Sequence, residues 1–203
     1  MKILCIGRNY AKHAEELNNP IPDDPIIFTK PPTALLQPGE DFVYPDFSDD
    51  VHYECELVLR IGQKGKNIPE DEAAGHVDAI ALGIDFTARD LQSKAKAKGL
   101  PWAIAKGFDG SAPVTSFIQI SRSYDLTDVR YSCEVNGELR QQGHTAMMLF
   151  PCATLVSYLS RFITLEPGDL IFTGTPAGVG PVERGDRLTG TLESKRMLDV
   201  KVV

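Results

Sequence analysis

The residues from His52 to Ile61 alternate between apolar and polar side chains, which predicts a β-strand with two different faces. One face carries the side chains of Tyr53, Cys55, Leu57, Leu59 and Ile61. The other carries those of His52, Glu54 and Glu56. Two carboxylates on one face repel each other unless their charge is neutralised or screened. Either a hard divalent cation binds them, or the face is solvated and water and salt screen the pair.

A second apolar run, residues 79–84, predicts a buried strand that ends at the acidic residue Asp85. A helix is expected after it, with Thr87 as its cap and Gly99 and Pro101 as its end. Three lysines occupy the later turns of this helix. We therefore interpret the lysine run as a helix end and not as an anion site.

Two pairs of polar side chains have the three-residue spacing that places them on one face of a helix. Arg89 and Gln92 lie near the start of the helix just described, where backbone N–H groups also point outward, and together they suit an anionic substrate. His13 and Glu16 lie in a short helix predicted over residues 11–17. There the carboxylate either orients the imidazole as a general base or belongs, with it, to an ordinary surface helix.

The remaining pattern predicts many short strands and few helices. Residues 129–135 and 138–142 flank Asn136-Gly137, a strong signal for a β-hairpin. Residues 151–162 have helical spacing, and residues 170–172 predict a short buried strand that leads into a glycine-bearing loop.

Two lysines lie in less regular sequence. Lys30 precedes two prolines and is either a substrate-contacting cation or a solvated lysine, of which we expect the second. Lys106 falls in residues 102–110, a predicted strand end followed by a loop, where it is either a desolvated functional lysine or an ordinary loop charge.

Composition narrows the class of protein. The chain has 203 residues, enough for one domain with a sizeable core, and we expect a single domain over residues 1–203. Its 21 basic and 28 acidic side chains give a formal charge of −7, and no basic run suits nucleic acid. No apolar segment approaches the roughly 20 residues of a membrane span, so we expect a cytoplasmic protein without a membrane partner. The four cysteines lack metal-ligand spacing, and buried reduced thiols are expected.

Taken together, these motifs resemble the fumarylacetoacetate hydrolase family, in particular its short acylpyruvase-like branch. The resemblance runs nearly end to end. It rests on the segment Gly7-Arg8-Asn9-Tyr10 with His13 and Glu16, on His52-x-Glu54-x-Glu56, on Asp85 with residues 89–92, on Lys106, and on residues 166–169 and 173–176.

The resemblance implies a fold and a site. The fold is an α+β mixed β-roll of the family's C-terminal-domain type with peripheral helices, usually assembled as a homodimer. Glu54, Glu56 and Asp85 would bind Mg²⁺ or Mn²⁺, and His13 and Glu16 would lie on a lid over the metal as catalytic residues, with Lys106 as a third. Substrate contacts would come from Arg8, Arg89, Gln92 and Thr175.

The expected chemistry is carbon–carbon hydrolysis of an acylpyruvate, such as acetylpyruvate or fumarylpyruvate, to pyruvate and a carboxylic acid. The substrate is a small 2-oxo acid, whose carboxylate and 2-oxo oxygens suit chelation of a hexacoordinate cation. The same site could instead tautomerise or decarboxylate oxaloacetate, or isomerise 2-hydroxyhepta-2,4-diene-1,7-dioate.

Overall fold

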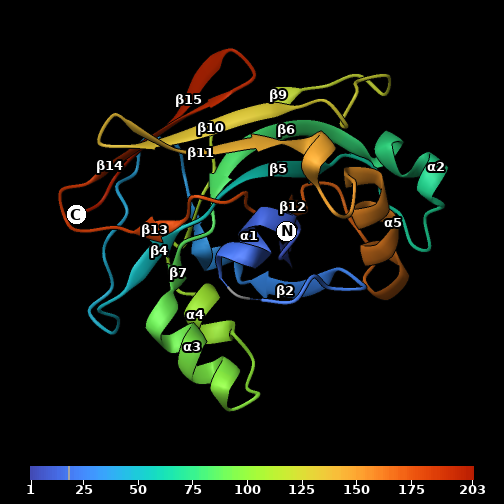
Figure 1. Cartoon of the computed structure of the whole chain (residues 1–203). Coiled ribbons are helices and arrows are strands. Elements are labelled where there is room, and N and C mark those ends of the chain that lie inside the picture. Colours follow the sequence, from blue (N-terminus) through green and yellow to red (C-terminus); the bar gives the residue numbers. More distant parts are fainter. Residues whose placement is uncertain (18) are drawn as a thin grey trace.

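The computed structural model describes residues 1–17 and 19–203, and its largest sheet has six strands in the order β2-β1-β12-β5-β6-β9 (Figure 1). These strands are β1 (Ile3–Gly7), β2 (Ile26–Lys30), β5 (Cys55–Ile61), β6 (Val77–Ile84), β9 (Ile118–Gln119) and β12 (Leu170–Phe172). Strands β1 and β12 are parallel, and the other neighbours are antiparallel. The sheet is therefore mixed, as expected.

A second sheet lies over the first and has four antiparallel strands in the order β11-β10-β14-β15 (Figure 1). Its strands are β10 (Arg130–Val135), β11 (Glu138–His144), β14 (Arg187–Leu192) and β15 (Lys195–Lys201). The turn between β10 and β11 has positive φ at both Asn136 (53°) and Gly137 (81°), which is the geometry of a two-residue type I′ hairpin. The predicted hairpin is confirmed.

Two small sheets complete the strands. One joins β13 (Gly180–Pro181), β4 (Val51–Tyr53) and β7 (Thr87–Ala88), and the other joins β3 (Leu35–Leu36) to β8 (Ala112–Pro113) in parallel. The predicted strand from residue 52 to residue 61 is thus two strands, β4 and β5, which pair in different sheets. The chain changes sheet at Glu54, the residue between them.

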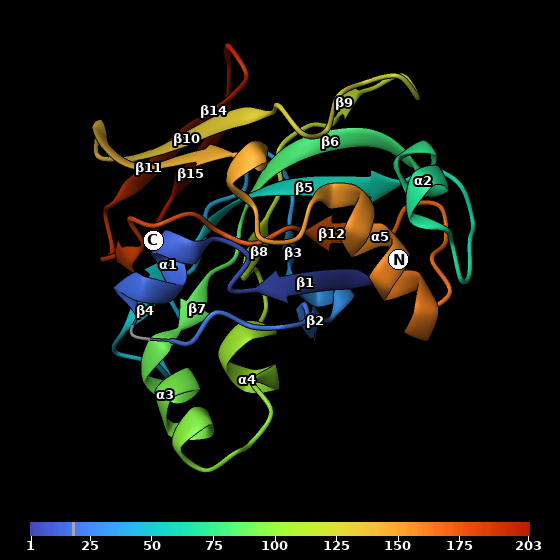
Figure 2. The ribbon, with the colours of Figure 1, turned by 45° about the vertical axis from the view of Figure 1, so that its right-hand side comes forward.

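The helices lie at the periphery. They are α1 (Ala11–Glu16), α2 (Glu70–Ala73), α3 (Arg89–Ala97), α4 (Ala103–Lys106) and α5 (Cys152–Phe162), with 3-10 turns at Pro32–Ala34, Ala74–His76 and Thr145–Met147. Figure 2 shows α2 and α5 at one end of the six-stranded sheet and α3 and α4 below it, near β2 and β7. Throughout residues 1–17 and 19–203, every helix falls short of the length and apolar character that crossing a bilayer requires.

Two local predictions were wrong. The segment expected to be a strand end contains α4, a single helical turn that presents Lys106. Thr87 does not cap α3, because it belongs to β7 and Ala88 occupies the N-cap position. The Thr87 hydroxyl is instead bonded to the Asp85 carbonyl (3.2 Å) and to the Lys106 ammonium (2.7 Å).

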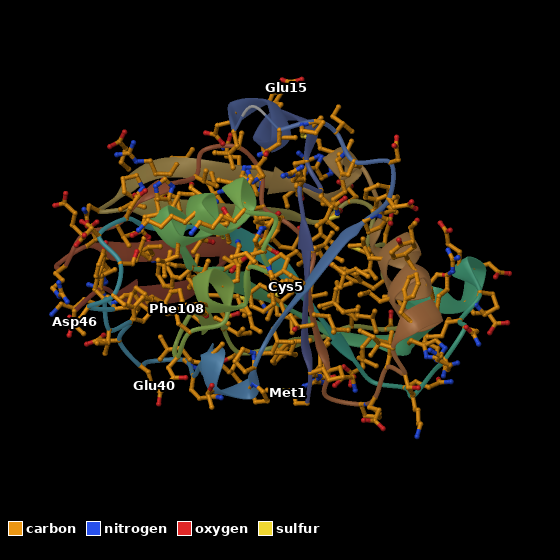
Figure 3. All side chains as sticks on the ribbon, turned by 90° about the horizontal axis from the view of Figure 1, so that it is seen from below. Met1, Cys5, Glu15, Glu40, Asp46 and Phe108 are labelled. Carbon is orange, nitrogen blue, oxygen red and sulfur yellow. The ribbon has the colours of Figure 1, made fainter. Side chains whose placement is uncertain are left out.

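The core follows the alternation of β5. Leu57, Leu59 and Ile61 are fully buried in the main apolar cluster, which also contains side chains of the four-stranded sheet and of α5. Val58 faces the opposite way, into a smaller cluster with Cys5 (labelled in Figure 3) and Phe172. All four cysteines are buried and free, as the sequence predicts.

Candidate active site

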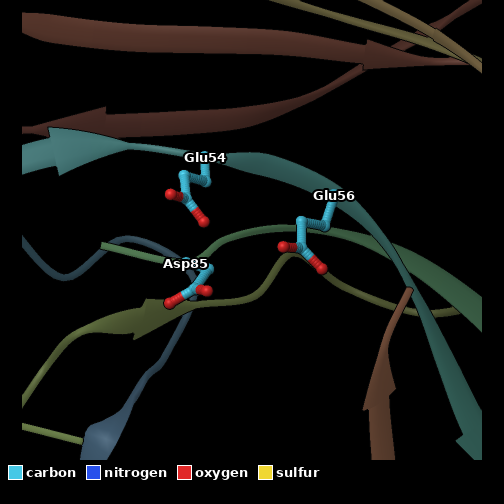
Figure 4. Close-up of side chains that lie close together, drawn as sticks. All are labelled: Glu54, Glu56 and Asp85. Carbon is cyan, nitrogen blue, oxygen red and sulfur yellow. The ribbon is translucent and has the colours of Figure 1, made fainter. Parts of the chain in front are cut away.

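Three acids meet where β5 and β6 approach the small sheet. The antiparallel register pairs Cys55 with Ile84, so the next residues along, Glu54 and Asp85, are opposite each other. The Asp85 backbone N–H donates to the Glu54 carbonyl at 2.8 Å and continues the ladder by one step. Glu56 lies two residues further on the same face as Glu54. Figure 4 shows the three carboxylates pointing toward one another.

The cluster of Glu54, Glu56 and Asp85 is buried and compact. One oxygen from each carboxylate lies within 4.8 Å of the others. The exposed fractions of the three residues are 5%, 1% and 0%. Three carboxylates this close and this dry cannot all stay ionised without compensating cations.

Lys106 and Arg89 supply part of that compensation. The buried Lys106 ammonium donates to Glu54 Oε2 at 2.7 Å and to Asp85 Oδ2 at 2.6 Å, and the Arg89 guanidinium donates to Glu54 Oε1. Burial raises the pKa of Glu54, but Lys106 and Arg89 outweigh it and hold that pKa well below its usual value. Burial alone would lower the pKa of Lys106, yet Asp85 and Glu54 raise it. Both groups are therefore charged at neutral pH.

Lys30 is the third cation, and the expectation that it is solvated was wrong. Its side chain is fully buried, and its ammonium forms an ion pair with Asp85 Oδ1 at 2.8 Å. It also donates to the Ser111 hydroxyl at 2.9 Å, to the Ser111 carbonyl at 3.1 Å and to the Lys106 carbonyl. Lys30 thus joins the end of β2 to the acid that follows β6 and to the end of α4.

We expect Lys30→Met to lower the free energy of unfolding of the metal-free protein by about 3 kcal/mol, since removing one member of a buried ion pair leaves the other charge poorly compensated. Lys201→Met is the matched control, because Lys201 also ends a strand but is exposed. Its effect should stay within about 0.5 kcal/mol. Urea unfolding monitored by circular dichroism measures both, and equal midpoints for the two variants would contradict the structural role of Lys30.

Glu56 differs from the other two acids because no lysine or arginine contacts it among the described residues. Its Oε2 accepts only the Gly174 backbone N–H, at 2.7 Å. Burial, followed by the charges of Asp85 and Glu54, raises the pKa of Glu56 well above its usual value. Gly174 has φ of 98°, and a Cβ there would lie 2.7 Å from Cβ of Asn9. Glycine is therefore required for this approach of the backbone.

The donor set fits a hard divalent cation. All three candidate ligands are carboxylates, the type of ligand that Mg²⁺ and Mn²⁺ prefer. A cation beside Glu56 would compensate the one carboxylate of the cluster that lacks a basic partner. The residues present are thus suited to the metal site that the sequence indicates.

His13 and Glu16 lie together on α1, as their spacing predicts. The His13 imidazole is buried, and its Nδ1 lies 3.6 Å from Glu16 Oε2, slightly beyond hydrogen-bond distance. Glu16 is held by the Gly178 backbone N–H at 3.1 Å. Burial has the largest effect on the pKa of His13 and lowers it. Glu54 raises this pKa and Arg89 lowers it, and the net change is a decrease. The imidazole is therefore neutral at pH 7 and can accept a proton.

Most of the predicted site residues line one small pocket. Its lining includes Arg8, His13, Glu54, Arg89, Gln92 and Lys106. Within it, Arg89 donates to Gln92 Oε1 at 2.7 Å, so the pair with three-residue spacing shares one face of α3. The pocket holds about 30 Å³, room for roughly two water molecules. A 2-oxo acid is larger than the volume that this side-chain arrangement encloses.

Thr175 is buried and does not line this pocket. Its hydroxyl donates to the Cys55 carbonyl and accepts from Gln141 Nε2, both at 2.8 Å. Gln141 in turn accepts the Cys55 N–H at 2.9 Å. In this structure Thr175 therefore holds β5 beside the acids, a supporting arrangement that the sequence did not reveal.

One family model matches the chain over nearly its whole length. The family model described as fumarylacetoacetate (FAA) hydrolase C-terminal matches residues 2–202. The chain belongs to the fumarylacetoacetate hydrolase family. Its mixed sheets with few helices are the fold of that family's C-terminal domain. This family fold, expected from the motifs, is confirmed.

The names of individual relatives describe several different activities. Over 98% of its length the chain is 42% identical to the mitochondrial oxaloacetate tautomerase FAHD1 of Mus musculus, of which it covers 90%. Over 91% of its length it is 46% identical to the mitochondrial oxaloacetate decarboxylase of Dictyostelium discoideum, of which it covers 85%. It also superposes on fumarylpyruvate hydrolase from Pseudomonas aeruginosa in complex with Mn²⁺ and pyruvate. That match has a TM-score of 0.95 and 42% identity, and covers 100% of this chain and 89% of the other. The family is one of enzymes, and this member has the acidic cluster of a divalent metal site.

Proposed function

We propose that this chain is an Mg²⁺- or Mn²⁺-dependent hydrolase that cleaves a carbon–carbon bond of acylpyruvates. The observation that supports this function best is the position of His13. A buried, neutral imidazole lines the same pocket as Glu54, with the Glu16 carboxylate beside its Nδ1. That is the arrangement expected of a general base that activates water. The pyruvate complex of the fumarylpyruvate hydrolase relative supports a 2-oxo acid as ligand.

In the proposed reaction, Nε2 of His13 takes a proton from water, because Nδ1 faces Glu16. The resulting hydroxide attacks the distal carbonyl carbon of the acylpyruvate. The carbon–carbon bond next to that carbonyl then breaks, and its electron pair leaves with the pyruvate enolate. The proton held by the His13 imidazolium returns to the enolate carbon and gives pyruvate. Glu16 stabilises the imidazolium formed in the first step.

Glu54, Glu56 and Asp85 would hold the cation, which when bound supplies a Lewis acid for the charge that develops on the 2-oxo oxygen. Gln92 and Lys106 are our candidates for stabilising the tetrahedral oxyanion, because groups aimed at developing charge act most strongly in a dry site. Lys106 would act through its positive charge, since its three N–H groups already donate to Glu54, Asp85 and Thr87. Arg89 and Arg8 would bind substrate carboxylate oxygens, to which a guanidinium can donate two hydrogen bonds. Thr175 would act through β5, because its hydroxyl is bonded to the Cys55 carbonyl.

A second candidate function is tautomerisation or decarboxylation of oxaloacetate. It is favoured by the names of relatives that are 42% and 46% identical to this chain. These reactions pass through the same enolate but need no activated water. His13 would then move a proton at the enolate carbon.

A direct assay separates the two functions. Purified protein loaded with Mg²⁺ or Mn²⁺ is given acetylpyruvate, fumarylpyruvate or oxaloacetate, while pyruvate release and enol absorbance are recorded. We expect cation-dependent pyruvate release from at least one acylpyruvate, with a kcat/KM at least 10-fold above the value for oxaloacetate. Faster conversion of oxaloacetate, with no cleavage of either acylpyruvate, would replace the hydrolase by the second candidate.

We further propose that residues 1–203 act as one catalytic domain and that the protein assembles as a homodimer, as the family resemblance implies. The main apolar cluster draws on both large sheets and on α5, which supports a single folding unit.

A further inference from the structure

An apolar groove adjoins the candidate active-site pocket. It holds about 460 Å³, a usual size for a small-molecule site, and lies between β2 and the segment that leads from α3 into α4. Figure 2 shows α4 beside β2, against which it packs. The side chain of Leu100 is exposed in the groove, so apolar surface faces water there. The residues that line the groove are all uncharged: Ile26, Ile27, Phe28, Thr29, Gly99, Leu100, Pro101, Trp102 and Ala103.

Two aromatic side chains line both the groove and the active-site pocket. They belong to Phe28 of β2 and to Trp102, the residue that precedes α4. Their ring centroids are 5.9 Å apart and their planes lie at 62°, which is an edge-to-face contact. On the pocket side, the Lys106 ammonium lies 5.0 Å from the centroid of the Phe28 ring. The groove and the pocket therefore share a wall, and these two rings form part of it.

The groove offers the space that the pocket lacks. The pocket encloses about 30 Å³ beside Glu54 and Lys106, less than a 2-oxo acid occupies, and the groove beyond the shared wall is many times larger. The polar head of a 2-oxo acid suits the carboxylate cluster with its cation. The rest of the molecule, where it extends toward Phe28, meets the two aromatic rings and the groove behind them.

The lining of the groove determines which tail fits it. A carboxylate placed there would lose water and find no cation among the lining residues, which is unfavourable. An alkyl or phenyl group would instead remove its own surface and that of the groove from water, which is favourable in proportion to the area buried. A phenyl ring can also pack edge-to-face against an aromatic side chain. The groove therefore suits a bulky apolar tail.

We propose that this groove is the subsite for the substrate's tail, that Phe28 and Trp102 contact the tail, and that the enzyme prefers 2-oxo acids with a bulky apolar tail. Among acylpyruvates, benzoylpyruvate is of this class. The subsite rests on the proposed function only in that a 2-oxo acid head binds at the carboxylate cluster. It does not depend on which reaction follows.

Binding of three ligands with the same head tests the subsite without hydrolysis. Calorimetric titration of the Mn²⁺-loaded protein compares 2-oxobutanoate with 2-oxo-4-phenylbutanoate, which adds a phenyl group at C4, and with 2-oxoglutarate, which adds a carboxylate there. All three lack the distal carbonyl that hydrolysis attacks. We expect 2-oxo-4-phenylbutanoate to bind about 10-fold or more tightly than either of the others, because only its tail gains from burial in the groove.

Fluorescence and one pair of variants locate the tail. Trp102 is the one tryptophan of the sequence, so its emission reports on the shared wall. The emission maximum should move to shorter wavelength with 2-oxo-4-phenylbutanoate, whose tail excludes water from the indole, and much less with 2-oxobutanoate. Leu100→Lys should reduce the preference for the phenyl ligand about 10-fold and tighten binding of 2-oxoglutarate, because it adds a cation to the groove. Leu139→Lys is the control, since Leu139 is an exposed leucine of β11 that lines neither cavity.

The outcomes are distinct. Equal binding of 2-oxo-4-phenylbutanoate and 2-oxobutanoate, or a preference that both variants retain, would overturn the subsite. If sedimentation shows that Leu100→Lys changes the oligomeric state while the preference remains, the groove is a contact between copies of the chain and the subsite is overturned. A preference that only Leu100→Lys reduces, in a protein that cleaves no acylpyruvate, would support the subsite and contradict the proposed hydrolase. No binding of any of the three ligands would overturn both.

Discussion

Glu56→Gln is expected to abolish metal-dependent turnover while the fold remains intact. Glutamine has nearly the shape of glutamic acid and can still accept the Gly174 N–H through its side-chain oxygen. It cannot supply the negative charge that a divalent cation requires. Because a Lewis acid contributes several kcal/mol to catalysis, kcat/KM should fall by about 10³-fold or more.

Thermal denaturation provides a second measurement for this variant. A cation that binds only the native state stabilises it by about 2.7 kcal/mol at 100 times its Kd. Mg²⁺ should therefore raise the Tm of the parent protein but not that of Glu56→Gln. Asp78→Asn is the control, because Asp78 lies on β6 and pairs with Arg60 away from the cluster. If Mg²⁺ shifts all three proteins equally, the cation binds elsewhere.

His13→Gln is expected to reduce acylpyruvate hydrolysis by about 10²- to 10⁴-fold, the usual contribution of a general base. The shift of Tm by Mg²⁺ should be unchanged, because His13 is not among the candidate metal ligands. Conversion of oxaloacetate needs no activated water, so its rate should fall less. Glu16→Gln should act in the same direction but more weakly, since Glu16 orients the imidazole and takes no proton from water.

Comparing acylpyruvate with oxaloacetate distinguishes the two possible roles of His13. His144→Gln serves as the control, because His144 pairs with Asp128 and lies outside the lining of the candidate active-site pocket. Equal losses on acylpyruvate and oxaloacetate in His13→Gln would show that the imidazole transfers protons at the enolate carbon. The assignment would then move from hydrolase to tautomerase or decarboxylase.

Short-range spacing was enough to predict the parts of the site that lie within one element. The pairs His13–Glu16 and Arg89–Gln92 each share a helix face. The alternation also predicted that Glu54 and Glu56 point the same way, although Glu54 lies between β4 and β5. In these cases the geometry of the local backbone places the side chains.

Contacts between distant segments could not be derived in this way. Asp85 meets Glu54 only because β5 and β6 pair in one particular register, and the family resemblance, not the spacing, indicated that they converge. Lys30 appeared solvated because its ion-pair partner, Asp85, is far away in the sequence. Threonine is a common N-cap residue, but the Thr87 hydroxyl instead accepts a hydrogen bond from the Lys106 ammonium.

The charge balance within the carboxylate cluster has a consequence for how the enzyme matures. Lys30, Lys106 and Arg89 compensate Glu54 and Asp85, and the raised pKa of Glu56 favours its uncharged form when no cation is bound. The chain can therefore complete its folding before any metal arrives, unlike small zinc domains whose folding depends on the ion. Metal loading becomes a late and reversible step. Occupancy of the folded site will then depend on the concentration of the divalent cation relative to its Kd.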